Sequence, residues 1–255
     1  MALRNKKTVS IVFVVVIAVA STFLFTQRTH APAAKTTSET AKTTTTQSND
    51  QGKDAVVTPP FDKKQLSIDS PESSWVVVNK TRPLDPLSYA PTDLVAVGGG
   101  QQLRSEAATA FLKMQTAAKN EGLNLLPMSG YRSYATQVSV YNSEVKAHGQ
   151  KVADTQSARP GTSEHQTGWA LDVGGGGCGI EDCFGSTEEG KWVAAHGYEY
   201  GFIIRYTPEF QQVTGYRAEP WHLRYVGTVL SQELHSQNVQ ALEIFFGLPD
   251  APDYK

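Results

Sequence analysis

The chain has 255 residues, of which 40% are apolar and 19% are charged, and its formal net charge is −2 at pH 7. This length and apolar content allow one sizeable hydrophobic core but hardly two. The near-neutral charge, without a basic patch or an aromatic RNA-binding motif, argues against a nucleic-acid-binding protein.

The N-terminal segment has the pattern of a membrane anchor. Residues 1–8 carry three cations, and an uncharged, mostly apolar run occupies residues 9–26. As a helix rising about 1.5 Å per residue, this run is just long enough to cross a bilayer. The preceding cations predict a cytoplasmic tail over residues 1–8 and a catalytic domain outside the cytoplasm, in a single-pass protein of the cell membrane. The small residues at positions 18–20 also fit a signal-peptidase site, and cleavage there gives a secreted protein.

Residues 27–60 are rich in Thr, Ala, Ser and Lys and contain no aromatic residue. A segment of this composition cannot bury enough apolar surface to form a core. We therefore predict a disordered stalk over residues 27–60 and one globular domain over residues 61–255.

The globular domain mixes helix and strand signals. In chain order we predict a helix over 104–120, a strand over 123–128, a helix from the N-cap Ser133 to Gly149, a helix opened by a capping box at 186–189 and ending before Gly197, and a strand over 201–206. Helices flank a few strands without a regular βαβ alternation. This order predicts an α+β fold with a small antiparallel sheet flanked by helices.

Helical spacing also predicts which residues the first two helices bury. In the first helix they are Ala108, Phe111, Leu112, Gln115 and Ala118. In the second helix they are Tyr134, Val138, Tyr141 and Val145.

Two short segments contain the residue types of a catalytic zinc site: SEHQTGWALD at 163–172 and EPWH at 219–222. Their two imidazoles and one carboxylate, from His165, His222 and Asp172, are donors that a tetrahedral zinc accepts, and three protein ligands leave the fourth position for water. The remaining carboxylate, Glu219, is then available as the base. We predict one Zn²⁺ per chain.

The first segment must turn to bring its two ligands together. On a continuous strand, His165 and Asp172 would lie about 23 Å apart at roughly 3.3 Å per residue. Gly168 is best suited to the turn because it has no Cβ. A short strand after it presents Asp172 on its polar face, away from the core. In the second segment, Pro220 blocks a helix, which predicts a strand that begins at the proline, with Glu219 just before it.

Two further sequence features resemble ligand sites, but we predict that neither binds a ligand. Cys178 and Cys183 are the only cysteines, and their spacing in a glycine-rich loop predicts a disulfide. As metal ligands they fit no common zinc pattern. The sequence at 185–191 matches the start of a phosphate-binding loop, but Trp192 stands where that loop needs Ser or Thr, so we predict no nucleotide site.

The pattern S-x-H-x-x-G-x-A-x-D followed by E-x-x-H resembles the LAS metallopeptidases, a group of D-alanyl-D-alanine carboxypeptidases and dipeptidases, and most closely the VanY-type carboxypeptidases. Further blocks that resemble this family, in the same order, are VNK at 78–80, SGYRS at 129–133 and RY at 205–206. The likeness covers roughly residues 75–247.

The resemblance implies roles for further residues. Arg132 would stabilise the charge that develops on the scissile carbonyl. Gln137 and Ser163 would bind the C-terminal carboxylate of the substrate, and Tyr206 would line the substrate cleft. The implied protein is a membrane-anchored zinc carboxypeptidase that removes the C-terminal D-alanine from peptidoglycan stem peptides. The alternatives are an L,D-carboxypeptidase, a peptidoglycan endopeptidase and, outside enzymes, a zinc-containing cell-wall binding module.

Overall fold

The computed structural model describes residues 60–255, which belong to one compact unit. The predicted cytoplasmic tail, transmembrane segment and stalk lie outside the described residues, apart from Pro60. Within the described part of the chain, no helix combines the length and the apolar character needed to cross a membrane.

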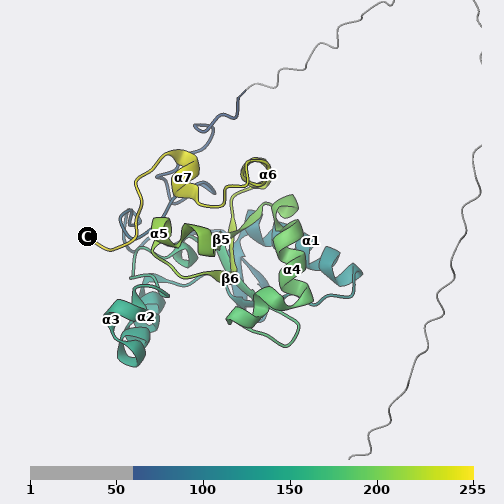
Figure 1. Ribbon diagram of the computed structural model, residues 1–255, viewed down its shortest axis with the longest axis horizontal. Coiled ribbons are helices and arrows are strands. Elements are labelled where there is room, and N and C mark those ends of the chain that lie inside the picture. The colour runs from purple at the N-terminus through teal and green to yellow at the C-terminus, as the bar shows by residue number, and fades with distance from the viewer. Residues whose placement is uncertain (1–59) are drawn as a thin grey trace, which may run out of the picture. The chain divides into compact units, whose positions relative to one another are not determined.

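A four-stranded antiparallel sheet forms the centre of the domain (Figure 1). Its strands follow the order β3-β4-β6-β5, with bounds Leu126–Ser129, Ala170–Gly174, Glu219–Tyr225 and Phe202–Tyr206. A separate antiparallel hairpin consists of β1, Leu94–Gly98, and β2, Gln101–Arg104. The expectation of an α+β fold with a small antiparallel sheet is confirmed.

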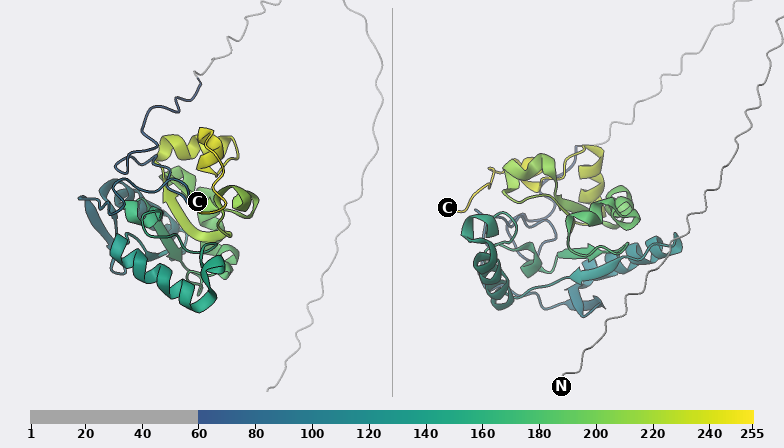
Figure 2. Two further views of the ribbon diagram at one scale, coloured as in Figure 1. Left: turned by 90° about the vertical axis from the view of Figure 1, so that its left-hand side faces the viewer. Right: turned by 60° about the horizontal axis from the view of Figure 1, so that its bottom comes forward.

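Seven α-helices are found among residues 60–255: α1 Ser105–Asn120, α2 Tyr134–His148, α3 Gln150–Ala153, α4 Glu188–His196, α5 Gln211–Thr214, α6 Thr228–Ser236 and α7 Leu242–Phe246. Helices α2 and α3 contact each other and lie at the opposite end of the domain from α1 and α4 (Figure 1). Figure 2 shows α6 and α7, in yellow-green and yellow, together at another end. Short 3₁₀ helices cover Glu164–Thr167, Asp182–Ser186, Gly197–Tyr200 and Pro208–Phe210.

The core follows the alternation of the central strands. One face of β4 and β6, including Leu171, Val173, Trp221 and Leu223, packs in a cluster with Phe111 of α1. A second cluster joins α6 and α7 to the segment around residue 75. Full burial of one such side chain stabilises the fold by about 1.5–3 kcal/mol. The opposite face of β4 and β6 therefore remains available for polar side chains.

The buried faces of the first two helices differ from the predictions. Helix α1 begins at Ser105 and buries Met114 in place of Leu112, which is 41% exposed, because Leu112 falls at the outer edge of the apolar stripe. In α2, the predicted apolar stripe is only partly buried, and Gln137 is the buried residue. Helix α2 packs against α3 and not on the main core, which explains why its buried residue is polar.

Three element boundaries also need correction. Strand β3 begins at Leu126 and not at residue 123. The predicted capping box at 186–189 does not form, because the N-cap is Thr187, whose Oγ1 accepts from Gly190 N. The Glu189 carboxylate instead accepts from Asn124 N. Glu219 is the first residue of β6, paired with Tyr206, and does not lie before the strand.

Candidate active site

A tight turn brings His165 back toward Asp172. After Ser163 the chain forms the 3₁₀ helix Glu164–Thr167, which ends at Gly168 with φ 75°, and β4 then begins at Ala170. A Cβ at Gly168 would lie 2.8 Å from Arg104 Cγ, so both the positive φ and the close approach require glycine. The predicted turn at Gly168 is therefore present, and its physical reason is the expected one.

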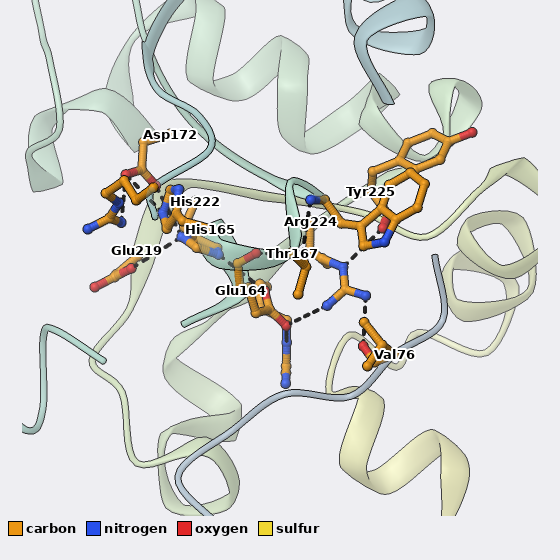
Figure 3. Close-up of polar contacts among 12 residues, drawn as sticks. Val76, Glu164, His165, Thr167, Asp172, Glu219, His222, Arg224 and Tyr225 are labelled. Atoms are coloured by element: carbon orange, nitrogen blue, oxygen red, sulfur yellow. Dashed lines mark hydrogen bonds and ion pairs between the residues drawn. The ribbon is translucent and has the colours of Figure 1, made fainter. Parts of the chain in front are cut away.

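The register of the sheet places the third predicted ligand. Strands β4 and β6 are neighbours, and Asp172 is directly opposite His222. The Asp172 carboxylate oxygens lie 3.3 Å from His165 Nε2 and 3.1 Å from His222 Nδ1. All three side chains are buried, and one donor atom from each lies within 4.8 Å of the others. Figure 3 shows the three side chains converging.

The orientation of each imidazole is fixed by its second nitrogen. His165 Nδ1 lies 2.8 Å from Gly130 O, and because a carbonyl can only accept, this nitrogen carries the proton. His222 Nε2 lies 3.2 Å from a Glu164 oxygen. The other nitrogens, Nε2 of His165 and Nδ1 of His222, therefore face Asp172.

This donor set fits a zinc ion. Donors about 2.0–2.2 Å from a tetrahedral zinc lie about 3.3–3.6 Å from one another, and the three donor atoms here already lie within 4.8 Å of one another. Two nitrogens and one oxygen, each imidazole held by an outer hydrogen bond, are typical of a catalytic zinc site with one open position.

The group lies in a cleft of about 430 Å³. Glu219 and Arg132 each lie next to one of the predicted ligands. Glu219 Oε2 is 3.9 Å from His222 Nδ1, and Arg132 Nη2 is 3.8 Å from Asp172 Oδ2. Ser163 also lines the cleft, as does Tyr206, whose ring centroid lies 4.9 Å from that of His222. The structure thus brings together all but one of the residues predicted for this site.

The exception is Gln137, which does not line this cleft. Its Nε2 donates to Ala158 O at 2.8 Å, and its Oε1 is buried without a hydrogen-bond partner. Ser157 and Ala158 themselves line the cleft. In this structure Gln137 therefore supports the cleft wall from behind, through its bond to Ala158.

Cys178 and Cys183 are joined in a disulfide. The bonded loop follows β4, and Ile180 within it lines the cleft. The disulfide therefore restrains one wall of the site next to the strand that carries Asp172.

Glu164 is a buried residue of the site for which the sequence predicted no role. Its side chain is fully buried and contacts His222, Arg205 and Arg224. The available signal was its position between Ser163 and His165, two residues assigned to the site. A charged side chain that is held inside a domain needs a partner of opposite charge.

The surroundings of the site shift the pKa values of its ionisable side chains in different directions. Burial raises the pKa of Glu219 to about 7, a value suited to a general base at neutral pH. Burial also lowers the pKa of His165 to about 4. Burial disfavours a charged His222, but the hydrogen bonds with Asp172 and Glu164 outweigh it and raise the pKa of His222 to about 9.

The raised pKa of His222 predicts pH-dependent zinc binding. Below about pH 9 the metal-free site holds a proton on Nδ1 of His222, which zinc must displace. One proton released per zinc means that the apparent affinity increases about tenfold per pH unit between pH 6 and 8. Chelator competition across this range measures the slope. An affinity that does not change with pH would contradict the protonation of His222.

Comparison with known proteins gives matches at the level of family, relatives and solved structures. Residues 100–228 match the family model described as VanY: D-alanyl-D-alanine carboxypeptidase. The putative carboxypeptidase YodJ of Bacillus subtilis (strain 168) is 41% identical over 190 residues, which cover 70% of this chain and 69% of that protein. The LD-carboxypeptidase LdcB matches at 40% identity with a TM-score of 0.64, over 71% of this chain and 88% of LdcB. A mutant of the vancomycin-resistance D,D-pentapeptidase VanY, in complex with Zn(II), matches at 30% identity with a TM-score of 0.60, over 68% and 98%.

Proposed function

The chain belongs to the VanY family of D-alanyl-D-alanine carboxypeptidases, and from this membership we propose that it is a zinc-dependent D,D-carboxypeptidase that removes the C-terminal D-alanine from peptidoglycan stem peptides. That the chain is an enzyme, a carboxypeptidase, follows from the family itself. The alternative of a binding module without hydrolysis is therefore dropped.

The observation that supports zinc is the convergence of His165, Asp172 and His222 beside the carboxylate of Glu219. These three side chains would hold the zinc ion, which when bound would acidify a water at neutral pH and polarise the scissile carbonyl. Glu219 accepts the proton of the attacking water and passes it to the leaving amine. Its burial next to the ligands keeps its pKa near the working pH, so it can do both.

We assign to Arg132 the donation of a hydrogen bond to the carbonyl oxygen of the scissile bond. Its guanidinium is close to Asp172, on the cleft side of the ligands, and its Nε is buried without a hydrogen-bond partner in the structure. A donor held ready in this way stabilises charge that appears only in the transition state.

This role predicts the kinetics of Arg132→Ala. We expect kcat to decrease by about 10²–10³, as for the loss of one oxyanion donor, with a smaller increase in KM. Steady-state kinetics on a stem peptide measure kcat and KM, and the zinc content of the variant is checked in parallel. An effect confined to KM would make Arg132 a residue that binds the substrate in its ground state.

The second candidate is an L,D-carboxypeptidase, and the 40% identity to LdcB favours it. The two activities differ in the residue before the scissile bond, which is D-alanine in a pentapeptide stem and an L-configured diamino acid in a tetrapeptide stem. A pocket that discriminates between side chains of this kind does so by about 1–3 kcal/mol, so both substrates should be cleaved at different rates.

The deciding experiment compares kcat/KM on L-Ala-D-Glu-L-Lys-D-Ala-D-Ala and on the tetrapeptide that lacks the last residue. We expect release of one D-alanine from the pentapeptide, followed by slower trimming, with products identified by mass spectrometry. A preference for the tetrapeptide would replace the D,D assignment by the L,D one and leave the zinc chemistry unaffected.

We also propose that the enzyme is anchored in the cell membrane through residues 9–26, with the catalytic domain outside the cytoplasm. The basis is the cationic and apolar pattern of the N-terminal sequence alone. The full chain should then sediment with membranes, whereas residues 61–255 should stay in the supernatant. Recovery of both in the supernatant would contradict the anchor.

A further inference from the structure

We propose that Glu164 is a positioning residue for the metal site: its carboxylate, fixed by two buried arginines, holds the Nε2–H of His222 so that Nδ1 faces the metal. The inference rests on the proposed zinc site. It gives a role to a charged side chain that the reaction itself does not use.

The two oxygens of Glu164 have separate partners. Oε1 accepts from Arg205 Nε and from Arg224 Nη1, both at 2.9 Å. Oε2 lies 3.2 Å from His222 Nε2. Figure 3 shows Glu164 between the ligand cluster and Arg224. The arginines therefore fix the carboxylate through one oxygen and leave the other for the imidazole.

The arginines are themselves fixed by the surrounding chain. Arg224 Nη2 donates to Ser74 O at 2.9 Å and to Val76 O at 2.7 Å. Arg205 makes a two-bond pair with Glu243 of α7, at 3.0 and 2.7 Å. Both guanidinium groups are completely buried. The position of Glu164 is thus determined by the segment at 74–76, by β5, by β6 and by α7.

The charges of this network balance, because Glu164 and Glu243 face Arg205 and Arg224. Burial of four charges is costly, and well-packed apolar residues often replace such networks without loss of stability. Stability alone is therefore a weak explanation for it. A carboxylate held rigidly against a ligand histidine has a function in addition, since it fixes the tautomer and raises the basicity of the metal-binding nitrogen.

The two ligand histidines differ in how their outer nitrogen is held. His165 uses a backbone carbonyl, Gly130 O, which stays in place whatever the side chains are. His222 depends on a side chain, Glu164. The orientation of His222 is therefore the one that a single substitution can change.

Glu164→Gln is the sharpest test. The arginines can only donate, so they will turn the amide oxygen of the glutamine toward themselves and its NH₂ toward His222. That NH₂ needs an acceptor, which favours the His222 tautomer with its proton on Nδ1, the metal side. We expect zinc affinity to decrease by about 10–100-fold, the usual effect of losing an outer-shell partner.

The matched control is Glu243→Gln. It removes the same charge from the same network by the same isosteric change, but Glu243 contacts Arg205 and Asn79 and has no contact with His222. Zinc affinity should remain within about threefold of wild type, since no ligand loses its outer-shell partner. Affinities are measured by chelator competition at a temperature at which circular dichroism shows all variants folded.

A second readout follows the tautomer directly. In ¹⁵N NMR spectra of the zinc-loaded wild type, His222 should carry its proton on Nε2. The inference is overturned if Glu164→Gln binds zinc as tightly as wild type, or if Glu243→Gln loses as much affinity as Glu164→Gln.

If Glu164→Gln does not fold, Glu164→Asp takes its place. It keeps a carboxylate for the arginines but is shorter by one carbon–carbon bond, about 1.5 Å, and cannot also reach His222. We again expect at least a tenfold loss of zinc affinity, and wild-type affinity would overturn the inference. A wild-type protein that binds no zinc would instead contradict the proposed function.

Discussion

Glu219→Gln is expected to keep zinc and to lose roughly 10²–10⁴ in kcat, the usual range for a general acid or base. The substitution preserves the shape of the side chain but removes its ability to accept a proton. The glutamate is not one of the three converging donors, although its Oε2 lies 3.9 Å from His222 Nδ1. The metal should therefore stay while the proton transfer is lost.

The measurement pairs kcat on the pentapeptide with zinc content by elemental analysis. A suitable control is Glu188→Gln, the same change at an exposed position on α4 that pairs only with Lys191. Near wild-type turnover by Glu219→Gln would remove Glu219 from the mechanism. Loss of zinc would make it a ligand.

The double variant His165→Ala, His222→Ala should contain no zinc and show no hydrolysis above background. It removes both imidazoles and leaves Asp172 as the only donor of the three. Wild-type protein over residues 61–255 should contain about one zinc per chain, as expected of a mononuclear catalytic site. Elemental analysis of both proteins tests the assignment of the site.

The matched control replaces two histidines outside the cleft, His196→Ala and His235→Ala. His196 pairs with Glu199, and the His235 ring stacks on Tyr198, so neither contacts the ligand cluster. This variant should keep its zinc. Full zinc occupancy in the His165, His222 double variant would show that the metal is bound elsewhere.

The sequence alone predicted the three candidate ligands and the local path of the chain between them. Asp172 and His222 were placed on the polar faces of their strands because side chains alternate along a strand. The turn was assigned to Gly168 because only glycine adopts its φ without strain. The N-cap Ser133 and the end of its helix at Gly149 followed from local hydrogen bonding and are present. These features depend on neighbours within a few residues, so a pattern can show them.

The tertiary structure alone decided the surroundings of the ligands. The register that sets Asp172 opposite His222 depends on the pairing of β4 with β6, which lie about fifty residues apart in the chain. The burial of Gln137 also depends on a distant part of the chain, and local periodicity could not distinguish this residue from a solvated glutamine. It is buried because Ala158, far along the chain, folds back over it.

The buried network around Glu164 shows most clearly what a sequence pattern cannot give. A charged residue is normally assigned to the surface, because an isolated charge is too costly to bury. That cost is offset only when partners of opposite charge reach the same place, and Glu164, Arg205, Arg224 and Glu243 come from four separate elements. The chemistry of the ligands was thus present in two short motifs, whereas the orientation of His222 is set by charges that only the folded chain brings together.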